Sequence, residues 1–510
     1  MFIKDWQMNE NWVLPIKDRQ PKRKLFQIIN FRKVFLLEKL ANPTGFAILS
    51  IFFILFAMGM AEQGIVFGVL ILLPFIAIPF VYSVVTFPKV GIYIYLTLSY
   101  FIFLFLRAGV KFPLGTLMDG ILLLLLVNLL IVQKKEHNWK IFKGPISKWV
   151  IVWIIFNLLE VGNPAAESRL AWVYTVRSVA IVQITYFIFL LNIKTRDFIK
   201  SIFKLWLFLA LIGALYGLKQ EYMGFFPFEN EYLHSDPNIE QLLFIGGTWR
   251  KFSIFNDPVI FAYTMVVTSC LCIGLMTGPL SKKNKWILGI LVFFYNWSML
   301  YSGTRGAFVL LPAAMVMFAI LKFNKYILFT AIALGLAFFV IINVPTSNYT
   351  LYRFQTAFKP DNDLSYLVRK HNQKRIQPYI LSHPMGGGLG STGEWGQRFA
   401  PNSYLAHFPP DSGYVRVAVE CGWGGLLIFC TLMFTILKTG IQNYYAIKDP
   451  QLKSFCLAML LIVCAFNVGN FPQEALVQFP SNIFFYLVAA IIVITRRMDE
   501  QQNAKLNATN

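Results

Sequence analysis

The chain has 510 residues, of which 57% are hydrophobic and only 14% are charged. A water-soluble protein of this size cannot bury so much apolar surface, so these proportions exclude a soluble globular domain and favour a lipid environment. The formal net charge of +21 is compatible with nucleic-acid binding, but the Lys and Arg residues cluster in short segments between apolar runs, a pattern typical of membrane topology.

Residues 1–42 are polar and basic, and they lack the features of a cleavable signal peptide. We expect them to form a cytoplasmic tail. Within the tail, Phe31–Leu37 fits an amphipathic helix lying on the membrane surface as well as it fits a solvated segment.

Continuous apolar runs of about 20 residues then recur along the chain, which favours helices over the alternating strands of a β-barrel. The prediction is an all-α polytopic membrane protein with about 14 transmembrane helices and a large, partly helical periplasmic loop. The expected spans are 43–60, 64–83, 88–106, 114–132, 147–161, 170–191, 200–217, 257–278, 285–300, 306–321, 326–344, 411–437, 453–468 and 480–495.

These spans and the polar intervals between them divide the chain into consecutive regions. After the tail, we expect a first group of transmembrane helices (43–217), an outer loop (218–256), further transmembrane helices (257–344), a large periplasmic loop (345–410), C-terminal transmembrane helices (411–497) and a second cytoplasmic tail (498–510).

The orientation follows from the distribution of basic residues between alternate loops. If the N-terminus is cytoplasmic, most loop Lys and Arg residues face the cytoplasm. The short loops on the other side hold only Arg107, Lys111, Arg169 and Arg305. Both termini are therefore predicted to be cytoplasmic, with the two long polar loops facing outward.

The six Cys residues all fall inside or at the edges of predicted spans. This placement disfavours a disulfide framework or a zinc site, so we expect small buried apolar side chains and no metal.

Four ionisable residues lie within the outward halves of predicted spans: Asp119, Arg177, Arg416 and Glu420. Because charge inside a bilayer is costly, such residues are functional candidates, and their convergence suggests a polar cavity open to the outside. Snorkelling and ion pairing are the alternatives, and the spacing of Arg416 and Glu420 fits a pair on one helix face.

The outer turn Tyr301–Ala307 contains an arginine, Arg305, against the positive-inside trend. An arginine flanked by glycines can bind a phosphate group through two parallel hydrogen bonds, although contact with lipid headgroups is the alternative. Arg250 and Lys251 precede a span on the same side and can complete a diphosphate clamp. Interfacial anchoring together with Trp249 explains their position equally well.

In the large loop, Asp363–Ser382 reads as a surface helix with a basic face that includes Arg375. The glycine-rich segment His383–Gly390 lacks the Lys-Ser/Thr of a nucleotide-binding loop, which favours a plain turn over an anion site. Asp411 is either the N-cap of the following helix or a general base that takes a proton from a sugar hydroxyl. His407 is a rival base.

From Arg250 to about Leu426, these motifs resemble the O-antigen ligase and O-antigen polymerase superfamily. The matching segments are the arginine and the Phe-Asn-Asp-Pro stretch of Arg250–Pro258, the turn Ser302–Gly306, the glycine turn His383–Gly388 and the Glu-x-Gly-x-x-Gly-Leu segment Glu420–Leu426.

The sequence departs from the family pattern just before the last of these segments. Counting back from Glu420, the family tyrosine falls on Tyr414 and the family histidine falls on Asp411. In ligases that histidine is the proposed base that activates the acceptor hydroxyl. A carboxylate can do the same work, so the departure bears on the ligase assignment rather than on the chemistry.

The resemblance implies a metal-independent, inverting glycosyltransferase, without a cofactor, that uses an undecaprenyl-diphosphate-linked glycan donor. Arg250 and Arg305 would stabilise the diphosphate leaving group and Asp411 would be the base, which makes these three the expected catalytic residues. The expected substrate-binding residues are Lys251, Arg177, Arg416, Tyr414, Glu420 and Arg375.

The resemblance further implies a bacterial inner (cytoplasmic) membrane protein with its active site facing the periplasm. Its partners would be the lipid-linked donor, a glycan or lipid A core acceptor, the bilayer and polysaccharide assembly proteins, and not nucleic acid. We expect a polymerase of O-antigen or exopolysaccharide repeats. The alternatives are an O-antigen ligase, a flippase or transporter of lipid-linked glycan, and a structural partner in an assembly complex.

Overall fold

The computed structural model describes residues 43–347, 354–355, 358 and 364–509. The predicted N-terminal tail and the surface helix considered at Phe31–Leu37 lie outside these residues. Two compact units make up the chain, divided between Val81 and Tyr82, and each is described by itself.

The first unit contains helix α1 (Pro43–Gln63) and most of α2 (Ile65–Thr86), joined by Gly64 in the left-handed region at φ 75°. The ring of Phe52 on α1 lies 6.3 Å from that of Phe75 on α2, so this aromatic contact joins the two helices. Many of the apolar side chains of this unit are exposed, as expected for a surface covered by lipid.

The second unit is a bundle of long helices with short elements between them. The long helices are α3 (Pro88–Arg107), α4 (Leu114–Glu136), α5 (Pro145–Leu159), α6 (Arg169–Val179), α7 (Ile184–Asn192), α8 (Arg196–Tyr222), α11 (Pro258–Met276), α12 (Lys282–Leu300), α13 (Arg305–Leu321), α14 (Lys325–Asn343), α18 (Gly413–Ala446), α19 (Pro450–Gly469) and α20 (Ser481–Thr509). The other elements are η4 (Trp139–Phe142), η5 (Glu160–Gly162), η6 (Ile181–Gln183), α9 (Pro227–Leu233), α10 (Pro237–Leu243), the antiparallel strands β1 (Phe244–Ile245) and β2 (Thr248–Trp249), the 19-residue helix α16 (Leu364–Ser382), α17 (Gly393–Phe399) and η8 (Leu405–His407).

Within the described residues, ten helical segments are long and apolar enough to cross a membrane, and Ile71–Thr86 and Arg305–Leu321 are shorter apolar helices. The protein is therefore an all-α polytopic membrane protein, as predicted. All of the expected spans, about 14 in number, fall on helices, and the four that are not among these ten segments fall on α2, α12, α13 and α14.

The expected span 170–191 is not one regular helix, because η6 separates α6 from α7. Polar side chains on both sides of this point bond to nearby backbone carbonyls. Ser178 donates to Thr175 O, Gln183 donates to Val179 O and Thr185 donates to Val182 O. Such local bonds compete with the regular helical ladder, which explains the tighter 3₁₀ turn.

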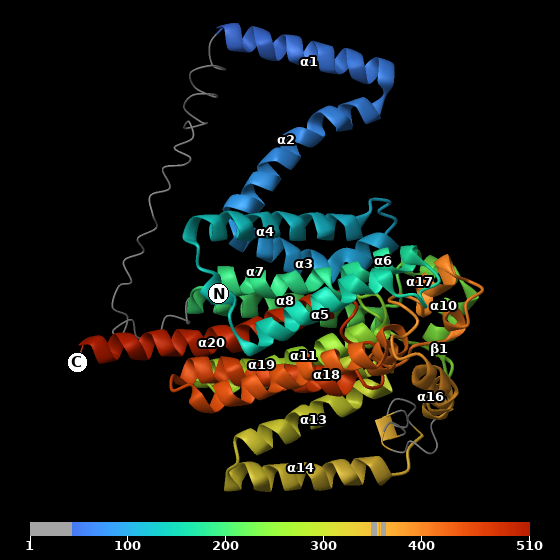
Figure 1. Ribbon diagram of the computed structural model, residues 1–510, viewed down its shortest axis with the longest axis vertical. Helices are drawn as coiled ribbons and strands as arrows, with labels where there is room; N and C mark the ends of the chain where they lie inside the picture. Colours follow the sequence, from blue (N-terminus) through green and yellow to red (C-terminus); the bar gives the residue numbers. More distant parts are fainter. Residues whose placement is uncertain (1–42, 348–353, 356–357, 359–363, 510) are drawn as a thin grey trace. The chain divides into compact units, whose positions relative to one another are not determined.

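The core of the second unit lies where α11, α19 and α20 pack together, and most of the side chains of these helices are buried. Small residues allow the close approach: a Cβ atom on Gly274 of α11 would lie 2.3 Å from Ala458 Cα of α19. Figure 1 shows α11, α18, α19 and α20 running side by side. This rigid core fixes the positions of the segments at either end of the bundle.

The two ends of this bundle differ in character. One end, here called the loop end, collects the segments 222–257, 301–304, 344–347, 364–412 and 470–480, which include the helices α9, α10, α16 and α17 (Figure 1). The opposite end, here called the lysine end, holds the turns 137–144, 193–195, 277–281, 322–324 and 447–449. Basic residues concentrate in and beside the turns of the lysine end, as the sequence predicts.

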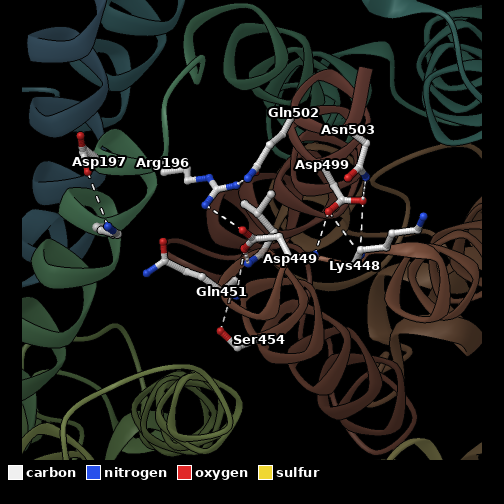
Figure 2. A network of polar contacts seen from close by, with 11 residues as sticks. Arg196, Asp197, Lys448, Asp449, Gln451, Ser454, Asp499, Gln502 and Asn503 are labelled. Atoms are coloured by element: carbon white, nitrogen blue, oxygen red, sulfur yellow. Dashed lines mark hydrogen bonds and ion pairs between the residues drawn. The ribbon is translucent and has the colours of Figure 1, made fainter. Parts of the chain in front are cut away.

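A polar network closes the lysine end and joins three helices (Figure 2). The buried carboxylate of Asp499 on α20 accepts hydrogen bonds from the backbone amides of Lys448 and Asp449, in the turn between α18 and α19. Asp449 in turn pairs with Arg196 at the start of α8 at 3.0 Å. Because these contacts hold its extension, α20 continues to Thr509, through most of the region expected to be a tail.

Candidate functional site

A partly open cavity of about 1010 Å³ lies at the loop end, between the ends of α3, α4, α6, α9, α11, α17 and α18 and the segment 470–480. Many polar groups line it. Its charged lining residues are Arg107, Asp119, Arg177, Glu231, Asp257, Glu394, Asp411, Arg416 and Glu474. A large concave site lined by converging charges on a rigid helical scaffold is the usual form of a binding or active site.

The predicted convergence of charged residues from separate spans is present in this cavity. Asp119 on α4 and Arg177 on α6 form an ion pair of 2.6 Å on its wall, and each side chain remains more than a third exposed. Arg416 on α18 also lines the cavity, whereas Glu420 lies one turn further along α18 and is buried behind the wall.

Arg416 is the centre of a buried charge network. Its guanidinium pairs with Glu420 at 3.2 Å and also with Glu474, and the side chains of both carboxylates are less than a fifth exposed. Glu420 additionally accepts hydrogen bonds from the hydroxyl and amide of Thr392, a residue of the cavity lining. The predicted Arg416–Glu420 pair therefore exists, as part of a larger network that fixes the cavity wall.

Asp411 lies on the cavity wall immediately before α18. It does not cap this helix, because the N-cap is Ser412, whose hydroxyl accepts from the amide of Val415. Burial raises the pKa of the Asp411 carboxyl, and the positive charge of Arg369 opposes this shift. A half-buried carboxylate with a raised pKa at a cavity wall has the properties of a general base.

Glu474, in the segment between α19 and α20, is a second acidic residue in the cavity lining near Asp411. Burial raises the pKa of its carboxyl, Arg416 opposes the shift, and the nearby charges of Glu420 and Asp411 raise it further. Asp411 and Glu474 thus lie close enough for their charges to interact, and one cavity wall combines two acidic groups with Arg416.

Arg250 is not part of the cavity lining. Its guanidinium donates to Ser302 O at 3.0 Å, to Thr304 Oγ1 at 3.0 Å and to Leu242 O at 3.4 Å. These bonds bring the two motifs of the predicted diphosphate clamp together, since Arg305 follows Thr304 directly. Arg250 holds the turn that carries Arg305.

Lys251 is not part of the cavity lining either. Its amide donates to Tyr301 O at 3.1 Å, and its ammonium pairs with Glu221 at 3.1 Å. The turn at Arg305 nevertheless lies near the cavity wall, because a Cβ atom on Gly306 would lie 3.4 Å from Pro472, next to the lining residues Gln473 and Glu474.

The glycine-rich segment after α16 is joined to an interruption in α18. Gly422 has a non-helical backbone, with φ 63° and ψ −162°, and this leaves the neighbouring backbone groups without helical partners. Gly387 N donates to Val419 O, Gly388 N donates to Glu420 O and Trp423 N donates to Pro384 O, each at 2.9 Å. These bonds occupy the amides that an anion would need, which agrees with the plain-turn interpretation.

Three other predicted residues lie outside the cavity lining. Arg375 is exposed on α16, and His407 is exposed in η8. Tyr414 donates from its hydroxyl to Asn467 Oδ1 at 3.1 Å and packs on Phe429 at 5.7 Å, so it fixes α18 against α19. From α16 it is instead Arg369 that reaches the site, where it bonds to Pro472 O at 3.2 Å and influences Asp411.

Sequence reasoning missed Arg107, which lines the cavity at the end of α3. Its guanidinium donates to Phe255 O at 2.7 Å and to Ser253 O at 2.9 Å, and it lies 4.3 Å from the ring centre of Phe252. Among the described residues, its buried Nε has no hydrogen-bond partner, as is also true of Arg177 Nε. Arg107 departs from the positive-inside trend in the same way as Arg305, so the sequence did contain a signal for it.

Sequence reasoning also missed an aromatic cluster on the wall next to Asp411. Tyr174 of α6 stacks on Trp395 and Phe399 of α17, with ring centres 4.7 and 5.1 Å apart. Tyr174 and Trp395 line the cavity. The seven-residue helix α17 is too short to give a periodic hydrophobic pattern in the sequence.

The fold and the cavity define a polytopic membrane protein with a charged site at one end of its helical bundle. Residues 288–430 match the family model of the O-antigen ligase domain, and this match supports the resemblance to the O-antigen ligase and polymerase superfamily. The matched region begins within α12, includes Arg305, Asp411 and Arg416, and ends within α18. A comparison with curated proteins found no significant match.

Proposed function

We propose that the protein is a membrane glycosyltransferase that polymerises undecaprenyl-diphosphate-linked oligosaccharide repeats. The observation that carries this proposal is the placement of Asp411, a half-buried carboxylate with a raised pKa, on a cavity wall that also holds Arg416 within the O-antigen ligase domain. The candidate base can remove a proton, and the same cavity carries Arg107 and Arg177, whose positive charge suits the departure of an anion.

In the proposed reaction, Asp411 takes the proton from an acceptor sugar hydroxyl. The oxygen attacks the anomeric carbon of the donor sugar, and the bond from that carbon to the phosphate oxygen breaks. The lipid diphosphate leaves with the bonding electron pair, so the anomeric centre is inverted. No redox partner is needed, and the proton held by Asp411 is released to solvent afterwards.

We assign the developing charge of the diphosphate to arginines at the loop end. Arg305 is the first residue of α13, and Arg250 supports its turn. Arg107 and Arg177 line the cavity and bring their positive charge to the place where the diphosphate would lie. Arg250 is thereby proposed as a positioning residue for Arg305 rather than as a direct phosphate ligand.

Polymerisation is preferred to ligation because of one residue, Asp411, which takes the place of the histidine typical of ligases.

Transport of a lipid-linked glycan is a weaker alternative. The charged residues of the cavity lie at the loop end, and the helices α11, α19 and α20 below it form a densely packed core with mostly apolar side chains. An enzyme that binds and releases its substrates on one side of the membrane needs no polar path through that core.

The distribution of charge supports a location in the bacterial inner membrane, with the lysine end in the cytoplasm and the cavity facing the periplasm. In this orientation the lipid-linked donor reaches the cavity from the outer leaflet, and both termini are cytoplasmic.

The proposal is tested by glycan transfer in proteoliposomes that contain an undecaprenyl-diphosphate-linked repeat unit. We expect the wild-type protein to yield a ladder of products and both Asp411→Asn and Arg305→Ala to lose it. Asp197→Asn is the control, because this carboxylate is exposed at the lysine end. Movement of the donor across the bilayer without any transfer would favour a flippase, and a single addition to a lipid A core acceptor would favour a ligase.

A further inference from the structure

The aromatic cluster of Tyr174, Trp395 and Phe399 combines an apolar surface with polar surroundings. Tyr174 is 37% exposed, although its ring packs on Trp395 and Phe399 of α17. Around it, the cavity lining carries Arg177, Asp119 and Glu394. Stacked aromatic rings bordered by charged groups suit a ligand with one apolar face and several hydroxyl groups.

A pyranose ring has this combination of groups. One of its faces is made of C–H bonds, whose partial positive charge suits the electron-rich face of an aromatic ring. Its hydroxyl groups lie around the edge, where carboxylate and guanidinium groups can bind them. A lipid chain would displace water from these partly exposed charged groups without offering them hydrogen bonds, so the cluster does not suit the lipid part of a substrate.

The cluster also lies close to the proposed base. A Cβ atom on Gly393 would lie 3.9 Å from Pro410, the residue before Asp411. Trp395 is two residues further along the same short helix and lines the same cavity. A sugar resting on Trp395 would therefore lie beside the carboxylate that must receive a proton from the acceptor.

The short helix α17 is held firmly, although it has only seven residues. A Cβ atom on Gly396 would lie 2.2 Å from Ser391 O, which shows how closely the helix packs on the preceding turn. Thr392, at the N-cap of α17, donates to Glu420 of the buried charge network. A surface held in place before the ligand binds loses little conformational entropy on binding.

We infer that Tyr174, Trp395 and Phe399 form the subsite for the acceptor sugar, with Tyr174 and Trp395 in contact with the ring. This inference rests on the proposed function, since it names the sugar-binding part of the same cavity. It holds for an acceptor that is another lipid-linked glycan and for one that is a lipid A core, because each presents a sugar hydroxyl to the base. The donor diphosphate then belongs to the arginine-bearing parts of the cavity.

The kinetic test compares the dependence of transfer on acceptor and on donor concentration. We expect Trp395→Ala and Tyr174→Ala each to raise the acceptor KM about tenfold while the donor KM changes less than about twofold. Tyr174→Phe keeps the ring and should restore an acceptor KM near that of the wild type. Trp286→Ala is the matched control, because Trp286 is exposed near the lysine end.

A binding test separates this inference from the proposed function. Acceptor oligosaccharide without lipid is titrated into Asp411→Asn protein in nanodiscs, and saturation-transfer NMR reports the protons that contact aromatic rings. We expect C–H protons of one sugar face to receive saturation, and Trp395→Ala in the same background to weaken binding about tenfold.

The outcomes of the two tests are distinct. Transfer by the wild type with an unchanged acceptor KM in folded Trp395→Ala and Tyr174→Ala would overturn the subsite and leave the proposed function intact. Sugar binding that depends on Trp395, without transfer from any lipid-linked donor, would support the subsite as a glycan-binding surface and overturn the proposed reaction. Absence of both binding and transfer would overturn both.

Discussion

The carbonyl oxygen of Pro384 accepts a hydrogen bond of 2.9 Å from the amide of Trp423, across the point at which α18 is interrupted. The bond joins the glycine turn after α16 to the middle of a long apolar helix. It explains why two glycine-rich segments, far apart in the sequence, occur together in this chain: each leaves room for the backbone of the other. The loop end is thus attached directly to the helix that begins beside Asp411.

Replacement of Gly422 by alanine should loosen this attachment. An alanine Cβ would lie 2.0 Å from Pro384 O, and the backbone φ of 63° is unfavourable for any residue with a side chain. We expect a loss of at least about 1–3 kcal/mol in the free energy of unfolding, measured by thermal denaturation in detergent.

Gly424→Ala is the matched control for this change. The nearest atom to a Cβ at this position is Phe156 Cε2 at 3.8 Å, an ordinary contact, so the variant should unfold close to the wild-type temperature. Equal stability of the two alanine variants would contradict the interpretation that close backbone packing between the glycine turn and α18 stabilises the fold.

The Asp411→Asn variant should lose transfer activity without losing stability. Because burial raises the pKa of Asp411 in the folded protein, the contribution of this group to stability is present at pH below the ordinary carboxyl range and is lost as pH rises through the raised pKa. At neutral pH the charge is therefore a cost, and its removal should leave the unfolding temperature unchanged or higher.

Transfer activity should fall by about 100-fold to 10,000-fold in the same variant, since a general base is lost. Parallel measurements of melting temperature and transfer rate check both statements. An unfolding temperature well below that of the wild type would show that Asp411 is a structural residue.

Most of the fold can be predicted from the sequence, because continuous apolar runs and the asymmetry of Lys and Arg residues are direct consequences of the membrane as a solvent. The break between α6 and α7 could not be predicted in this way. It depends on side-chain bonds from residues such as Gln183, and these compete with the helical ladder without changing the hydropathy of the run.

Only part of the candidate site could be predicted from the sequence. Ionisable residues in spans pointed to the cavity, since Asp119, Arg177 and Arg416 line it. The direction of a loop side chain carries no such signal, and for this reason Arg250 was expected at the cavity but bonds to the neighbouring turn. Similarly, α16 has basic residues on several faces, and only the folded chain distinguishes Arg369 from Arg375.

Loss of the Arg416 charge, at the centre of the buried network, should strongly lower the stability of the folded protein. Arg416→Met leaves the carboxylates of Glu420 and Glu474 buried and unpaired, and breaking a buried pair in this way costs about 3–5 kcal/mol. We expect a markedly lower melting temperature in detergent. The triple variant Arg416→Met, Glu420→Gln, Glu474→Gln removes all three charges and should recover much of the loss, whereas a single variant as stable as the wild type would show that the network carries no such energy.

Arg369 should set the lower pH limit of the reaction. Its positive charge lowers the pKa of Asp411 against the effect of burial, so Arg369→Ala should raise that pKa further. Because the reaction needs the ionised carboxylate, the acid limb of the pH profile of kcat/KM should move to higher pH, by up to about one pH unit. Lys374→Ala removes the same charge from an exposed position on the same helix and should leave the profile in place. A uniform loss of rate in Arg369→Ala, without movement of the acid limb, would show that Arg369 acts only by holding the backbone at Pro472.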